Sequence, residues 1–242
     1  MKIAIVTSSP DLVSAYIDNT ILKQAVLNKS VSFFNFDIRE HSNGQYRQID
    51  DTPFGGGFGM VLMPAPLIKA IDNAFIALDA NVDNTRVIYP SPQGKLWTQD
   101  HALENVKIEN IIFICGRYKG IDQRVIDEYV THEYSLGDFI ISNGELGSMV
   151  MIDSILRFLP GTMNNIESAL SDSFPSNLLD HPHYTKPRVI KGLSVPEVLL
   201  GGHHKKIKSW RRNKSEDATK SKRPDLWEKY NKSIKQLEIN HE

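Results

Sequence analysis

The sequence predicts an α/β fold with a mainly parallel sheet, followed by a small all-α C-terminal domain. Short apolar runs typical of buried strands alternate with stretches of helical period over most of the chain. The charge is divided unevenly: residues 1–175 hold 13 Lys and Arg against 21 Asp and Glu, and residues 176–242 hold 15 against 8. We therefore expect one domain over residues 1–161, a flexible linker over 162–175 and a second domain over 176–242.

The composition excludes several classes of protein. An apolar share of 40% with 24% charged residues, over 242 residues, is ordinary for a globular protein. Cys115 is the single cysteine, which excludes an internal disulfide and a cysteine-pair zinc motif and indicates a reducing compartment. No apolar run approaches the ~18 residues of a membrane span, and the apolar run from Ile3 is too short for a signal peptide. We expect a cytoplasmic protein with no membrane partner.

The first elements follow from apolar runs and glycine content. The continuous apolar run in Lys2–Ser8 predicts a buried strand. A broken amphipathic stripe predicts one helix over Asp11–Asn28, and three phenylalanines favour a strand over Val31–Ile38. Asp50–Met60 (DDTPFGGGFGM) predicts a mobile loop, and it lacks the Gly-Lys-Ser/Thr ending of a phosphate-binding P-loop. Pro64–Leu78 predicts a helix with proline at its start.

Strands and helices continue to alternate through the middle of the chain. Apolar runs predict strands at Arg86–Tyr89, Ile111–Cys115, Tyr134–Leu136 and Phe139–Ser142. Period and end signals predict helices that begin after Thr98 and that cover Asp122–Tyr129 and Leu146–Leu159. In the C-terminal third, helices are expected within His203–Asn213, Asp217–Arg223 and Pro224–Leu237. The basic charge of this third indicates a polyanionic partner, with a solvated basic tail as the alternative.

Three segments that contain glycine can together build one pocket. They are Tyr89–Gly94 (YPSPQG), Cys115–Asp122 (CGRYKGID) and Ser135–Met149 (SLGDFIISNGELGSM), and each follows or contains a predicted strand. Glycine lets the main chain approach a ligand closely, so such loops can bind through backbone groups. Three tight connections in an α/β sheet are the alternative interpretation.

These segments and four others occur in the order found in one enzyme family. The sequences that carry the likeness are DDTPFGGGFGM, YPSPQG, CGRYKGID, SLGDFIISNGEL, RFLPG, DSF at Asp172 and LLDHPHYTKP from Leu178. The chain resembles the bacterial tRNA (guanine-N1)-methyltransferases that act at guanosine 37. That family belongs to the SPOUT class of knotted methyltransferases that depend on S-adenosylmethionine. The resemblance covers nearly the whole chain.

The resemblance implies a trefoil-knotted N-terminal domain, a homodimer with active sites at the subunit interface, and S-adenosylmethionine as methyl donor. Mg²⁺ is a further cofactor that it brings into consideration. The donor-binding positions that carry over are Tyr89, Pro90, Ser91, Gly94, Gly116, Leu136, Gly137, Asp138, Phe139, Ile140, Ile141 and Gly144. Backbone N–H and C=O groups in turns of this kind can hold adenine and ribose without particular side chains.

Two residues carry over as catalytic. Guanine N1 is a poor nucleophile until its proton leaves, and the resemblance implies Asp172 as the general base. Negative charge then builds on guanine O6, and Arg157 matches the arginine that stabilises this charge in the family. Both have simpler alternatives. Asp172 can cap the first C-terminal helix, and Arg157 can pair with Asp153, one helical turn earlier.

The basic C-terminal domain is expected to bind tRNA phosphates. The expected contacts are Lys205, Lys206, Lys208, Arg211 and Arg212. Trp210 is expected in the core of this domain rather than as a stacking platform. His181, His183, His203 and His204 suggest a metal, but we identify no carboxylate or thiol at ligand spacing beside them and expect no metal site.

The chain departs from the family pattern at four positions. Relatives usually carry Glu where this chain has Lys119, Gly at Asn143, Leu at Pro90 and Arg at Thr52. Lys119 reverses a charge near the expected site, which argues against a carboxylate-assisted role for Mg²⁺ there. Two alternative functions follow: a protein that binds S-adenosylmethionine and RNA without turnover, and an enzyme that methylates another RNA.

Overall fold

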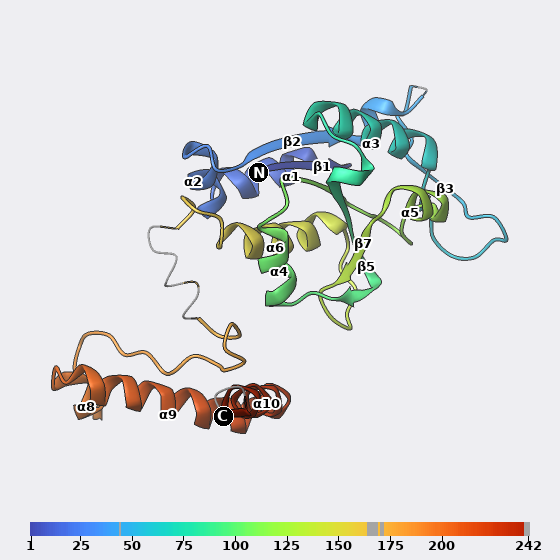
Figure 1. Cartoon of the computed structure of the whole chain (residues 1–242). Helices are drawn as coiled ribbons and strands as arrows, with labels where there is room; N and C mark the ends of the chain where they lie inside the picture. Colours follow the sequence, from blue (N-terminus) through green and yellow to red (C-terminus); the bar gives the residue numbers. More distant parts are fainter. Residues whose placement is uncertain (44, 164–168, 170–171, 240–242) are drawn as a thin grey trace. The chain divides into compact units, whose positions relative to one another are not determined.

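The computed structural model describes residues 1–43, 45–163, 169 and 172–239 (Figure 1). The chain divides into two compact units, Met1–Ile166 and Glu167–Glu242. The expected linker includes residues 164–168 and 170–171, which lie outside the described residues. Among the helices described, none combines the length and the hydropathy needed to cross a membrane.

The first unit is built on a five-stranded sheet in which every neighbouring pair of strands is parallel. In order across the sheet, the strands are β2 (Ser32–Asp37), β1 (Lys2–Thr7), β6 (Asn110–Ile114), β5 (Thr85–Leu96) and β7 (His132–Ser135). The central strands β1 and β6 are almost wholly apolar and buried. This composition is typical of parallel strands, because helices cover both faces of the sheet.

Alternate side chains of the central strands enter two cores, one on each face of the sheet. Ile3 and Phe113 belong to one core, and Ala4 and Ile112 to the other. The first core is covered by α1 (Pro10–Asp18), α2 (Ile21–Leu27), α4 (Gln99–Asn105) and α6 (Gly144–Leu156). The second is covered by α3 (Pro64–Leu78) and α5 (Gln123–Tyr129). Figure 1 shows α3 and α6 on opposite sides of the sheet.

Several of the expected elements differ in the structure. The helix expected over Asp11–Asn28 is two helices, because the Thr20 side chain caps α2 by accepting the N–H of Leu22. The strand expected over Phe139–Ser142 is a loop. The glycine-rich Asp50–Met60 segment begins in a strand, since β3 (Asp50–Asp51) pairs with β4 (Val61–Leu62) to make a short hairpin.

The YPSPQG segment, expected as a turn, is an irregular part of β5. Pro90 and Lys95 both pair with Tyr134 of β7, so the residues between them bulge out of the ladder. A Cβ atom on Gly94 would lie 2.4 Å from the backbone nitrogen of Tyr134. The missing side chain therefore lets the bulge lie directly against β7.

The second unit was expected to be all-α, but this is wrong. Strands β8 (Val189–Ile190) and β9 (Leu193–Ser194) form an antiparallel hairpin in it. The helices of this unit whose bounds are described are α8 (Glu197–Leu200), α9 (His204–Lys222) and α10 (Pro224–Ile239). Helix α9 runs unbroken through two segments that were expected as separate helices. Arg212 ties α9 to α10, since its guanidinium donates to Glu216 Oε1 at 2.8 Å and to the Tyr230 hydroxyl at 3.1 Å.

Candidate active site

A pocket of about 520 Å³ lies at the carboxyl ends of β5, β6 and β7. The loops that follow parallel strands meet at this edge, where open α/β sheets bind their ligands. Its lining comes chiefly from three parts of the chain, around Tyr89–Pro92, Gly116–Gly120 and Ser135–Gly144. The three segments that the sequence singles out by their glycines are thus brought together.

Ten of the twelve residues expected to bind the donor line this pocket. They are Tyr89, Pro90, Ser91, Gly116, Leu136, Gly137, Phe139, Ile140, Ile141 and Gly144. Gly94 and Asp138 are not among the lining residues. The close contact of Gly94 with Tyr134 gives this glycine a packing role between β5 and β7.

Two glycines allow the main chain itself to form one wall of the pocket. A Cβ atom on Gly116 would lie 2.9 Å from the Tyr89 ring, and one on Gly144 would lie 2.5 Å from the backbone nitrogen of Gly116. The N–H of Gly144 donates to the carbonyl of Gly116 at 2.8 Å. Beside them, Arg117 and Asn143 form an antiparallel bridge. The two segments therefore close against each other through backbone atoms.

Burial controls the protonation of two groups at this wall. It raises the pKa of Tyr89 to about 12, and the negative charge of Glu133 adds to the effect. The Tyr89 hydroxyl is therefore neutral at physiological pH and can donate a hydrogen bond. Burial, helped by the charge of Glu145, also raises the pKa of the Cys115 thiol. Cys115 is thus a protonated core residue rather than a nucleophile.

Several lining residues were not predicted, among them Gly59 and Met60 of the glycine-rich loop. The N–H of Lys119 donates to the carbonyl of Met60 at 3.0 Å, and a Cβ on Gly59 would lie 2.9 Å from Lys119 Cγ. The end of the glycine-rich loop is therefore packed on the CGRYKGID segment. The many glycines of the loop indicate that its main chain can pack closely against another segment. The sequence does not show which segment that is.

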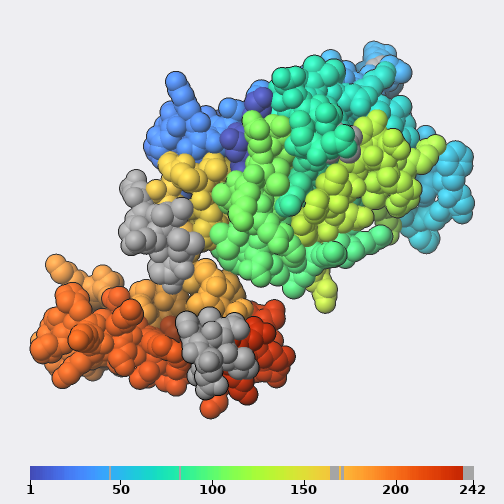
Figure 2. All heavy atoms as spheres, viewed as in Figure 1, coloured from blue at the N-terminus to red at the C-terminus, as the bar shows by residue number. Residues whose placement is uncertain are grey.

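The rest of the glycine-rich loop projects from the first unit (Figures 1 and 2). The side chains of Phe54 and Phe58 are fully exposed on it. Tyr118, across the pocket rim, adopts a left-handed φ of 58°, which is uncommon for a residue with a side chain. No carboxylate belongs to the lining as far as the structure describes it, so the lining does not support the Mg²⁺ that the resemblance brought into consideration.

Arg157 follows the last residue of α6 as its C-cap. Its charge acts on Asp153: burial, the larger effect, raises the pKa of this carboxyl group, and the guanidinium of Arg157 lowers it. The i,i+4 spacing therefore brings the two charges close enough to influence each other. It is compatible with a catalytic role, because a paired carboxylate can orient an arginine.

Asp172 belongs to the second unit and lies in a bend. The alternative in which it caps the first C-terminal helix is wrong, since residues 173–178 form bends and turns instead of a helix. The next residue, Ser173, accepts the N–H of Asp180 on its Oγ at 2.9 Å. The DSF motif is thus fixed to the DHPH segment of the same unit.

The five basic residues expected to bind tRNA all lie on α9. Lys205, Lys206, Lys208 and Arg211 are exposed. Arg212 differs from them because its guanidinium is engaged with Glu216 and Tyr230. These two contacts raise the pKa of Arg212, and the hydrogen bond that Arg212 donates to Glu216 is the largest cause.

The expectation that no carboxylate lies beside the histidines is wrong. Asp180 Oδ2 lies 2.8 Å from His183 Nε2, and Asp180 Oδ1 lies 3.8 Å from His181 Nδ1. The ligand atoms of these three residues are all within 4.8 Å of one another. The Asp-His-Pro-His order is visible in the sequence, but the spacing alone does not predict that the His183 side chain contacts Asp180.

The fold and the pocket are typical of α/β enzymes that bind a small ligand at the carboxyl ends of parallel strands. The family model described as tRNA (Guanine-1)-methyltransferase TrmD matches residues 1–229. The chain belongs to this family of tRNA (guanine-N1)-methyltransferases.

Three relatives, each named tRNA (guanine-N(1)-)-methyltransferase, agree with this assignment. The chain is 45% identical over 231 residues to the one from Clostridioides difficile (strain 630), which covers 96% of this chain and 99% of the relative. It is 44% identical over 240 residues to that of Shouchella clausii (strain KSM-K16), with 99% and 96% covered. The relative from Buchnera aphidicola subsp. Schizaphis graminum (strain Sg) is 44% identical over 234 residues, with 97% and 87% covered.

Proposed function

We propose that the chain transfers a methyl group from S-adenosylmethionine to N1 of guanosine 37 in tRNA, in the cytoplasm. The observation that carries the proposal is the glycine-lined pocket at the ends of β5, β6 and β7, in a chain that the family model matches over residues 1–229. Family membership supports the reaction class, and the pocket offers a place for the donor. We also propose that the methylated nucleotide is guanosine 37 and that Asp172 and Arg157 are catalytic.

The lining suits this donor in size and chemistry. A volume of about 520 Å³ falls within the range of small-molecule sites. Leu136, Phe139 and Ile141 offer apolar surface for the adenine ring, and the main chain at Gly116 and Gly144 offers polar groups for the ribose. When bound, the donor supplies a methyl group on a sulfonium, which leaves as a neutral thioether. The protein contributes mainly by positioning the two reactants.

In the proposed reaction, the Asp172 carboxylate accepts the proton of guanine N1. The electron pair left on N1 forms the bond to the methyl carbon while the bond from that carbon to sulfur breaks. Negative charge that develops on O6 is stabilised by the guanidinium of Arg157. Arg157 belongs to the first unit and Asp172 to the second, so the proposal requires that bound tRNA present one base to both.

We further propose that the first unit carries the trefoil knot and forms a homodimer. The closure of Gly144 on Gly116 supports a chain that folds back tightly at the expected knot loops. Helix α6 is apolar on two sides: Ile152 is buried, whereas Leu146 and Val150 are 48% and 50% exposed. A helix that is apolar all round is typical of one buried on every side. A second copy of the chain would cover this face.

The second unit is proposed to bind tRNA through residues 176–242. Lys205, Lys206 and Lys208 are exposed along α9, where a phosphate backbone can reach them. Binding through such contacts releases counterions, so affinity should fall steeply with salt.

The proposal is tested by incubating the protein with labelled S-adenosylmethionine and two tRNA transcripts, with G or A at position 37. Label should enter only the G37 transcript, and mass spectrometry of the digested product should find 1-methylguanosine. Donor binding without transfer to either transcript would favour a binding protein. Label in both transcripts would indicate a different target.

A further inference from the structure

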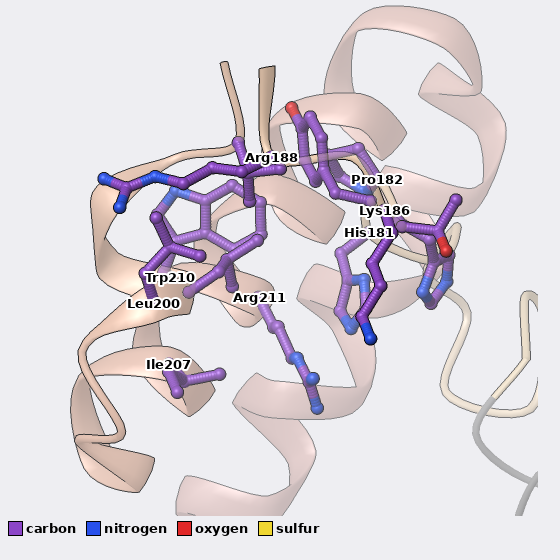
Figure 3. A pocket seen from close by; sticks show the side chains of 13 residues that line it. His181, Pro182, Lys186, Arg188, Leu200, Ile207, Trp210 and Arg211 are labelled. Atoms are coloured by element: carbon purple, nitrogen blue, oxygen red, sulfur yellow. The ribbon is translucent and has the colours of Figure 1, made fainter. Parts of the chain in front are cut away.

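The second unit contains a pocket of its own, of about 460 Å³. It lies between the segment His181–Arg188 and helices α8 and α9 (Figure 3). Leu199, Leu200 and Ile207 give it an apolar side. The function proposed above leaves this pocket without a role, and its size is suited to a single nucleotide.

Aromatic rings gather around this pocket. The ring centroid of Trp210 lies 6.4 Å from that of Tyr184 and 6.4 Å from that of His181. Trp210 is only partly buried and lines the pocket, so the expectation that it is a core residue is wrong. Two aromatic faces beside an open space of this size are typical of sites where a nucleobase stacks.

The polar lining of the pocket is cationic. Lys186, Arg188 and Arg211 are exposed at it, and no acidic residue belongs to its lining within the part of the chain that is described. Arg188 is paired with Glu197 at 2.7 Å. Neither Lys186 nor Arg211 has a hydrogen bond or ion pair to any described side chain. Figure 3 shows Arg211 between Trp210 and Lys186. Two cations are thus placed beside the aromatic rings.

The histidine side of the pocket is fixed by contacts within the second unit. The Asp180 carboxylate accepts the N–H of His181 at 2.7 Å and is 2.8 Å from His183 Nε2. The N–H of Leu179 donates to Thr219 Oγ1 on α9 at 2.8 Å. The segment is therefore anchored to the helix that carries Trp210. A rigid site loses less entropy when it binds its ligand.

We propose that this pocket binds one unpaired nucleotide of the substrate RNA, other than the guanosine that is methylated. The base stacks on Trp210 with the Tyr184 ring, tilted by 54°, at its edge, and its phosphate is held by Arg211 and Lys186. The inference rests on the proposed function, because it takes RNA as the substrate. The pocket would then be a second site of RNA recognition, in addition to the site of methylation. Only an RNA loop with unpaired bases can fill it.

A divalent cation on Asp180, His181 and His183 is the competing occupant. The charge of the surroundings decides against it. Lys186 and Arg211 line the same pocket as both histidines, and a cation there would be repelled by them. The same two charges attract a phosphate. The Asp180 carboxylate then holds His183 in place instead of binding a metal.

The test compares two variants of the full chain with matched controls in tRNA binding. Trp210→Leu keeps apolar bulk without a stacking ring and should raise the Kd for the G37 transcript about tenfold. Trp210→Phe should restore most of the affinity. Arg211→Gln should weaken tRNA binding. It should also reduce the slope of log Kd against log salt concentration by about the amount expected for one phosphate contact. Lys214→Gln removes a charge from the same helix outside the pocket and should leave the salt dependence closer to wild type than Arg211→Gln does.

A duplex RNA without unpaired nucleotides separates stacking from general damage to the domain. Its Kd should be the same for Trp210→Leu and wild type. An equal loss for duplex and tRNA would overturn the proposal, as would a tRNA affinity of Trp210→Leu within twofold of wild type. Zn²⁺ that binds wild type but not His183→Ala, and that leaves tRNA binding unchanged, would also overturn it. If wild type fails to methylate any tRNA, the proposed function fails instead, whatever the binding results.

Discussion

The backbone N–H of Gly144 donates to the carbonyl of Gly116 over 2.8 Å, and the gap between the two residues has no room for a side chain. A Cβ atom on Gly144 would meet backbone atoms of Cys115 and Gly116, which cannot rotate away as a flexible side chain can. The wall of the proposed donor pocket therefore depends on the absence of one methyl group.

Gly144→Ala should consequently weaken donor binding by at least tenfold, because the two segments must move apart. Overpacking of this kind should also lower the free energy of unfolding by ~1–3 kcal/mol. Titration calorimetry with S-adenosylmethionine and denaturant unfolding measure the two effects. Gly201→Ala is a suitable control, since its Cβ would have no neighbour closer than 3.7 Å and should change stability by less than ~0.5 kcal/mol. Wild-type donor affinity in Gly144→Ala would contradict this account of the wall.

Tyr89 should make the free energy of unfolding depend on pH in a way that can be assigned to this one residue. Its pKa is raised from 10.0 to about 12 by burial and by the charge of Glu133, so the folded state holds the proton more tightly than the unfolded state. The resulting stabilisation is complete below pH 10 and is lost as the pH rises through 12. Over this interval, wild type should lose ~2 kcal/mol more of its free energy of unfolding than Tyr89→Phe.

Denaturant unfolding of both proteins at pH 9, 10, 11 and 12 measures this difference. Tyr46→Phe serves as the control, because Tyr46 is 89% exposed and its replacement should leave the wild-type pH dependence intact. If the free energy of unfolding depends on pH in the same way for wild type and Tyr89→Phe, burial does not raise the pKa of the Tyr89 hydroxyl as the structure indicates.

The exposed side of α6 makes a prediction about assembly. Val150→Lys places a charge in the apolar face that we propose for the homodimer, so this variant should be monomeric at micromolar concentration, with weaker donor binding. Size-exclusion chromatography with light scattering gives the mass directly. Ile76→Lys is the matched control, because Ile76 is 76% exposed on α3, which covers the other face of the sheet, and its replacement should leave the oligomeric state unchanged. A monomeric wild-type protein would exclude the homodimer.

The central strands could be predicted from the sequence because their physical signal is local. Ile3–Val6 and Ile111–Ile114 are apolar on both faces, and only a covered parallel strand suits such a run. The same apolar signal wrongly predicted a strand at Phe139–Ser142, where Ile140 is 78% exposed and lines the proposed donor pocket. Periodicity cannot distinguish a residue buried by its own fold from one that faces a ligand or a second subunit.

The residues of the candidate site were found through the family pattern and not through their surroundings. Gly94 matched that pattern, yet its contact with Tyr134 shows a packing role that depends on the register of β5 and β7. Asp180 directly precedes His181, yet the sequence does not predict that its carboxylate contacts the histidines. In both cases the decisive contact depends on backbone geometry, which spacing along the chain does not specify.

Asp172 and Arg157 make the most direct prediction about the chemistry. An amide at position 172 cannot take the proton from guanine N1, so Asp172→Asn should lower kcat by about 10²- to 10⁴-fold. Arg157→Gln should lower kcat by about 10²-fold or more, because the negative charge that develops on guanine O6 is then no longer stabilised by a guanidinium. Single-turnover methylation of the G37 transcript measures both. Asp217→Asn, at an exposed position on α9, should keep kcat near that of wild type.

Binding measurements decide what a loss of turnover means. If Asp172 is the base, Asp172→Asn keeps both S-adenosylmethionine and tRNA affinity, because the carboxylate acts only on the proton that leaves. Ser173, the next residue, holds the DHPH segment through the N–H of Asp180, so a structural role for Asp172 would disturb that segment and reduce tRNA binding in parallel. Full activity of Asp172→Asn with G37 tRNA would exclude Asp172 as the base, since the amide side chain can accept a hydrogen bond but cannot take up a proton at neutral pH.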